Sequence, residues 1–160
     1  MTTRFFLSVL CAFLLASNAY PQAATSDSNL YHKALSVCVE KQSQEYKNLG
    51  GEHDYLNRIV EKNIFLTDKL PTQIGEYRVK YLDGDGLIAR YKQIRKPFLI
   101  LSMRPMMNDG SMLKISLADY WIRYEKLTLS FGLEGGCNVF FRYDCEQKTY
   151  AIDKIDLWGI

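Results

Sequence analysis

Histidine is scarce in this chain, and its scarcity bears on metal sites and on acid–base catalysis. The 160 residues include two histidines, His32 and His53, which lie far apart in the sequence. Neither has a second histidine at the spacing of a helical metal site, and the sequence contains no H-E-x-x-H, G-x-S-x-G or phosphate-binding glycine motif. We therefore expect no metal ion, no cofactor and no catalytic residue, and the sequence favours a non-enzymatic protein.

A dominant charge of one sign is also missing. The chain has 20 Lys and Arg against 18 Asp and Glu, which gives a formal net charge of +2. Proteins that bind nucleic acids depend on a basic surface that neutralises phosphates. We therefore expect no nucleic-acid partner.

Long apolar runs are limited to one, which lies near the start of the sequence. Phe5 to Ala16 follows the basic residue Arg4 and precedes small residues at 17–19. This pattern is typical of a signal peptide, and a run of about a dozen residues is too short to span a bilayer. We predict that residues 1–19 are cleaved on export to the periplasm or the exterior, with no membrane association afterwards. Residues 20–29 are predicted to be a flexible leader, and residues 30–160 a single α+β domain.

Cysteines are few, and three of the four lie beyond the predicted signal peptide: Cys38, Cys137 and Cys145. An oxidising compartment permits a disulfide bond. Cys137 and Cys145 fall on one predicted strand, where eight residues span about 26 Å, far beyond the roughly 7 Å that a disulfide allows between Cα atoms. Cys38 could therefore pair with Cys137 or with Cys145. The alternative is that all three cysteines are reduced and buried.

Two helices are predicted in the first part of the domain. The first spans residues 30–49, with a buried stripe at spacings of three and four formed by Leu30, Ala34, Leu35, Cys38, Gln42 and Tyr46. Gly50 and Gly51 end it. The second is predicted over residues 52–64, with inward-facing Leu56, Ile59, Val60 and Asn63 or Ile64.

Strands follow these helices. Residues 75–82 alternate apolar and polar side chains and predict a half-buried strand. Asp83 to Gly86 is predicted to be a hairpin turn, because a calcium loop would need a closing glutamate where Ile94 stands. Residues 87–96 fit a helix or a strand, and the apolar run 98–101 predicts a strand covered on both faces.

The C-terminal part predicts a long antiparallel sheet. Strands are expected at 113–124, 127–133, 137–145 and 149–158, with a glycine turn at 134–136. The alternation slips at Ala118–Asp119 and again near Asp153–Lys154, which predicts β-bulges and hence a curved sheet. The sequence therefore predicts an α+β fold, with N-terminal helices packed on a curved, bulged antiparallel sheet.

This order of elements resembles the cone-shaped NTF2-like and cystatin-like folds. The resemblance covers most of residues 30–160 and rests on element order alone. It implies a bent sheet that wraps a helix and leaves a cavity between them. No motif of either family is present, so no functional residue is transferred.

One candidate ligand site lies on the strand predicted at 113–124. Asp119, Trp121 and Arg123 share one strand parity, so they would converge on a ligand if that face lined a cavity. Tyr120 and Tyr124 are added as further lining residues. The alternative is that the charged residues face solvent and that Arg123 pairs with Asp119.

A candidate partner surface is predicted from Phe140, Met106 and Met107. Phe140 is an aromatic residue on the otherwise polar parity of its strand, and methionines are frequent at adaptable contact surfaces. Two functions remain open. One is an exported binding domain, such as an inhibitor or immunity-type protein, with an unidentified protein partner. The other is a cone domain that binds or processes a small ligand near Asp119.

Overall fold

The computed structural model describes residues 30–50, 54–64 and 71–159. The predictions on the signal peptide, the leader, Gly51 and His53 fall outside these residues. Within them, neither helix is long and apolar enough to cross a membrane.

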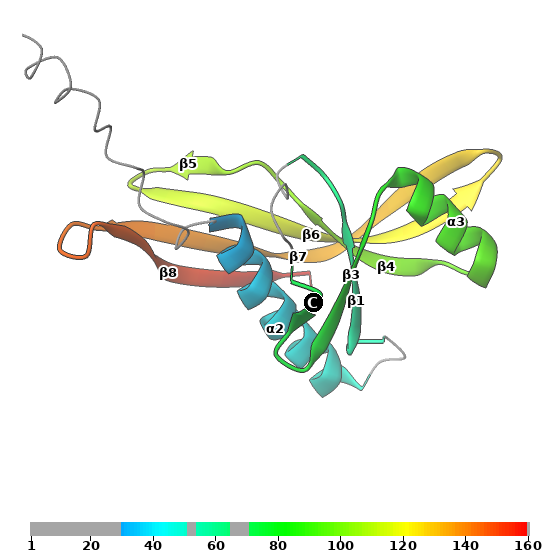
Figure 1. Ribbon diagram of the computed structural model, residues 1–160, viewed down its shortest axis with the longest axis horizontal. Helices are drawn as coiled ribbons and strands as arrows, with labels where there is room; N and C mark the ends of the chain where they lie inside the picture. The colour runs from blue at the N-terminus through cyan, green and yellow to red at the C-terminus, as the bar shows by residue number, and fades with distance from the viewer. Residues whose placement is uncertain (1–29, 51–53, 65–70, 160) are drawn as a thin grey trace, which may run out of the picture.

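An open eight-stranded sheet and two helices form the described part of the chain (Figure 1). The α+β class is confirmed. The helices are α2 (Leu30–Leu49) and α3 (Gly84–Ile94). The strands are β1 (Asn57–Glu61), β2 (Gln73–Ile74), β3 (Tyr77–Leu82), β4 (Phe98–Met103), β5 (Met107–Asp109), β6 (Met112–Glu125), β7 (Thr128–Asp144) and β8 (Thr149–Trp158).

The sheet is mixed rather than wholly antiparallel as predicted. Its order is β2-β3-β1-β4-β6-β7-β8, and β5 pairs with β6 beside this path. β1 runs parallel to both β3 and β4, and the remaining pairs are antiparallel. The parallel pairs arise because residues 57–61 form a central strand where a helix was expected.

The helices cover opposite faces of the sheet. α2 packs its apolar stripe on a core that includes Leu101 of β4, whereas Leu87 of α3 packs with Ile100 of the same strand. Consecutive residues of a strand point to opposite faces. The larger core therefore lies under α2 and the smaller one under α3.

The predicted helix at 30–49 is confirmed, and its stripe faces the sheet. All six predicted residues, from Leu30 to Tyr46, are buried. Gly50 has a φ of 64°, in the left-handed region that commonly follows a helix end.

The prediction of a second helix at 52–64 is wrong for its described part. Val60 is buried as expected, but Leu56 and Ile64 are exposed. Strand alternation instead turns Arg58 and Val60 toward α2, with Ile59 toward the other face. The buried charge of Arg58 concealed this alternation in the sequence.

Asp83 to Gly86 begins a helix and is not a hairpin turn. The side chain of Asp83 caps α3 by accepting a hydrogen bond of 2.9 Å from the backbone N–H of Gly86. The ambiguous segment 87–96 is therefore helical through Ile94.

β6 carries no bulge of its own at Ala118–Asp119. It stays in register with β4 across this point. Its apolar parity changes because Ile115 and Leu117 pack under α2, whereas Ile122 packs under α3. The extra residue lies in β7, where Glu134 falls between the partners of Asp119 and Tyr120.

β7 runs without a turn through 134–136, so the predicted break between two strands is wrong. The absence of a side chain at these glycines lets neighbouring residues pack closely against the β7 backbone. A Cβ on Gly136 would lie 2.4 Å from the carbonyl oxygen of Leu117 and 2.4 Å from Cζ2 of Trp158. The turn between β6 and β7 lies instead at Lys126 and Leu127, both with positive φ.

The bulge predicted near Asp153–Lys154 is confirmed. Phe140 pairs with Lys154 and Phe141 with Ile152, so Asp153 is the extra residue. It re-phases β8, so that Tyr150, Ile155 and Leu157 all pack toward the α2 core.

Candidate functional site

The five residues of the predicted ligand site are not brought together. Asp119, Trp121 and Arg123 share one face of β6, and Tyr120 and Tyr124 the other. Asp119 is fully buried and Arg123 is exposed. The indole Nε1 of Trp121 donates a hydrogen bond of 2.8 Å to Glu134 Oε2. Asp119 is therefore bound within the interior, and Arg123 is not its partner.

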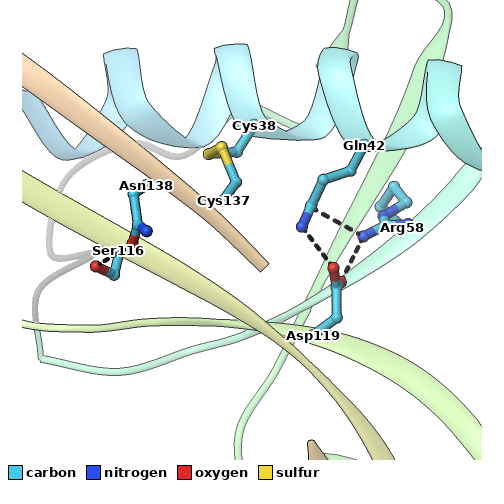
Figure 2. Close-up of a disulfide and its surroundings, with 7 residues drawn as sticks. All are labelled: Cys38, Gln42, Arg58, Ser116, Asp119, Cys137 and Asn138. Atoms are coloured by element: carbon cyan, nitrogen blue, oxygen red, sulfur yellow. Dashed lines mark hydrogen bonds and ion pairs between the residues drawn. A yellow bond between two sulfur atoms is a disulfide. The ribbon is translucent and has the colours of Figure 1, made fainter. Parts of the chain in front are cut away.

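The partners of Asp119 come from α2 and β1 (Figure 2). Arg58 Nη2 lies 2.8 Å from Asp119 Oδ1, and the amide of Gln42 donates to Asp119 Oδ2. The hydroxyl of Tyr46 lies 3.4 Å from the same Oδ2. All four side chains are buried. We call this set the buried polar cluster.

Burial sets the electrostatics of this cluster. Desolvation raises the pKa of Asp119, against the opposing effect of the Arg58 charge. Desolvation also raises the pKa of the Tyr46 phenol, assisted by the negative charge of Asp119. Because the carboxylate is enclosed and bound by donors from two other elements, the cluster joins α2, β1 and β6.

Three of its members were missed as a polar group in the sequence. Gln42 and Tyr46 were assigned to the apolar stripe of the first helix, and Arg58 to a helix that does not form. One signal was present, because a glutamine on an apolar stripe requires a buried hydrogen-bond partner. Nothing in the linear sequence identified that partner as Asp119.

A disulfide bond lies beside the cluster (Figure 2). Cys38 of α2 is joined to Cys137 of β7, with Cα atoms 5.9 Å apart. Cys145 is free and exposed. The structure thus forms the first of the two pairings that the sequence left open.

The predicted partner residues lie at one end of the sheet. Met106 and Met107 are exposed, at 40% and 51%. Met107 pairs with Lys114, which pairs with Phe140, which pairs with Lys154. Since paired residues share a face, these four side chains form one row across four strands. We call Met106 and this row the methionine end.

Phe140 is less accessible than predicted for a contact residue, with 9% exposure. The ammonium groups of Lys114 and Lys154 lie 6.0 and 5.6 Å from its ring centroid. Both positions fit cation–π contact. A partner would reach the ring only after these flexible side chains move aside.

An open groove lies elsewhere, between the start of α2 and β8. Its lining includes His32, Lys33 and Glu40 from the helix, together with Pro71 and Ile152. The ring atom Nε2 of His32 is buried without a hydrogen-bond partner among the described residues. Lys33 and Glu40 bring opposite charges to the groove, and none of the predicted ligand residues lines it.

Metal-binding groups do not gather in the described ranges, where no three His, Cys, Asp or Glu side chains lie close enough to hold an ion. Comparison with known proteins gives no relative: the chain matches no protein-family model, no curated protein and no solved structure.

Proposed function

We propose that this chain is an exported, non-enzymatic domain that binds another protein through the methionine end. The observation that carries the proposal is the placement of Met107 and Phe140 in one cross-strand row, on strands far apart in sequence. Export follows from the signal-peptide pattern of residues 1–19. An inhibitor or immunity-type protein is the class that this description fits.

The chemistry of the methionine end suits an adaptable protein contact. Methionine side chains are flexible and polarisable, so they can fit an uneven partner surface. Lys114 and Lys154 lie near Asp109 and Asp156 at 3.9 and 3.8 Å, which are loose ion pairs at the surface. Such pairs contribute little to folding, so rearranging them on binding costs little.

A rigid base supports this surface. The disulfide bond and the buried polar cluster fix α2 to the sheet from the opposite face. Pre-ordering of this kind lowers the entropic cost of association.

The likeness to NTF2-like and cystatin-like cones remains a proposal too, and it rests only on a long helix lying across a bulged sheet.

The test is capture of a partner by the full-length chain, tagged at its C-terminus and expressed in its source cells. We expect one stoichiometric protein partner by mass spectrometry. The double variant Met106→Ser/Met107→Ser should lose it. The matched control Leu49→Ser alters a residue that is 66% exposed on α2 and should retain it.

Retention of the partner by the methionine variant would place the contact elsewhere. Absence of any protein, with a small molecule co-purifying in native mass spectrometry, would refute the binding-protein proposal and favour a ligand-binding domain. Cleavage after Ala19, read by N-terminal sequencing, tests export independently.

A further inference from the structure

β7 is longer than the strand that covers its outer edge. β8 pairs only with residues 136–144 of β7. Residues 128–133 pair with β6 on one side, and no described strand lies on the other. Figure 1 shows β8 ending near the middle of the molecule while β7 continues to the hairpin tip beside α3. This stretch, Thr128 to Leu133, is the open edge.

The open edge lacks two features that commonly keep sheet edges apart, charge and proline, and the β-bulge at Glu134 lies just beyond its end. Its sequence, Thr-Leu-Ser-Phe-Gly-Leu, contains no charged residue and no proline. Natural edge strands are commonly protected by lysine, proline or an inward-pointing charge, because their free N–H and C=O groups pair with other chains. Phe131 and Leu133 are 45% and 58% exposed. The edge is therefore both apolar and able to form backbone hydrogen bonds.

The open edge is also held in place before any partner arrives. The rings of Phe131 and Tyr120 are in edge-to-face contact, with their centroids 5.9 Å apart. Leu129 packs against the core under α3. A preformed strand avoids much of the entropy loss that ordering would cost on binding.

We propose that the open edge pairs antiparallel with the same edge of a second copy, about a two-fold axis at Ser130. This register places Leu129 opposite Phe131 in both halves, and these residues face the α3 side. It also brings Lys126 of each copy toward Glu134 of the other, whose carboxylate accepts the Trp121 hydrogen bond within its own chain, so the flanking charges are opposite in sign. The register thus matches apolar residues in the middle with opposite charges at both ends.

Two-fold pairing of this kind is closed. Each copy uses the same patch, so the contact ends with two chains and cannot propagate. It involves the hairpin end of the sheet and leaves the methionine end free. The inference goes beyond the proposed function and does not depend on it.

Charge at Ser130 tests the register, because this residue would face itself across the axis. We expect a dimer of the wild-type chain in sedimentation equilibrium over a concentration series. Ser130→Glu and Ser130→Lys should each weaken it about tenfold or more, since like charges directly opposite repel. An equimolar mixture of the two variants should restore the dimer.

Controls separate pairing from folding. Ser111 is exposed in the turn before β6, so Ser111→Glu and Ser111→Lys should dimerise like the wild type. Circular dichroism should be unchanged in all four variants. A monomeric wild type, a dimer that both Ser130 variants keep, or a mixture that stays monomeric would each overturn the proposal.

The same variants distinguish this proposal from the proposed function. Ser130→Glu should still capture a protein partner through the methionine end. If it loses a captured foreign protein instead, the open edge holds a strand of that protein and not of a second copy.

Discussion

Arg58 and Asp119 place opposite charges in the interior, where both side chains are almost completely removed from water. Their side chains are 5% and 0% exposed, and their closest atoms are 2.8 Å apart. A buried pair of this kind adds little stability over an apolar replacement, because desolvation offsets the attraction between the charges. Its value here is positional, since it fixes β1 to β6, and Gln42 and Tyr46 add α2 through their hydrogen bonds to Asp119.

Removing one partner of this pair should be costly. We expect Asp119→Ala to lower the free energy of unfolding by about 3–5 kcal/mol, because Arg58 would be left as an uncompensated buried charge. The double variant Arg58→Met/Asp119→Leu should recover most of the loss. Urea denaturation measures both, and a double variant as unstable as Asp119→Ala would contradict the argument.

The raised pKa of Asp119 predicts how its contribution depends on pH. A carboxyl group whose folded pKa lies above its ordinary value of 3.8 stabilises most below that value, and the stabilisation is lost as pH rises through the folded pKa. Relative to Asp119→Asn, the wild type should therefore lose stability as pH rises from 3.8. Unfolding of both proteins across this range isolates the effect, and a difference that is constant or rises with pH would exclude it.

Within the elements, the middle of β7 depends on the absence of a side chain. A Cβ on Gly136 would overlap the backbone of β6 and the ring of Trp158. We expect Gly136→Ala to destabilise the protein by about 1–3 kcal/mol or more, as overpacking does. Gly132→Ala is the control on the same strand, because its Cβ would lie 3.7 Å from the nearest atom. Thermal unfolding should separate the two variants, and equal midpoints would show that β7 can shift.

Elements whose apolar residues pack mainly on one core were predictable from the sequence. The first helix and the re-phased last strand each pack on the α2 core alone, and the strand at 77–82 turns Tyr77, Val79 and Tyr81 to that core, with only Leu82 packing under α3. β6 was misread because it serves two cores on opposite faces. β1 was missed because Arg58 occupies an inward position that an apolar residue would normally fill.

The candidate site shows the same limit. The sequence marks Asp119 as a candidate ligand residue by strand parity, but its partners in the structure lie 61 to 77 residues away in the sequence. Strand parity grouped it with Trp121 and Arg123, which share its face but lie farther along β6, beyond the cluster. Parity within one strand cannot show which neighbouring element covers each part of that face.

Across the whole molecule, the Cys38–Cys137 bond closes a loop between residues 99 apart in sequence. A cross-link of this span restricts the unfolded chain by about 4–5 kcal/mol in the loop-entropy model. We expect reduction to lower the urea midpoint accordingly, and Cys145→Ser to leave it unchanged. A midpoint insensitive to reductant would show that the bond contributes little.

That bond also determines how the chain would respond to mechanical tension. Of the residues that the structure describes, the first part of α2 and the β7–β8 hairpin after Cys137 lie outside the loop, so a pulling force along the chain bypasses everything between the two cysteines. An extended chain spans about 3.3–3.6 Å per residue, so a loop between residues 99 apart withholds about 330–360 Å of contour length. Under force, the oxidised protein would therefore extend by a short length on unfolding, and the reduced protein by a much greater length.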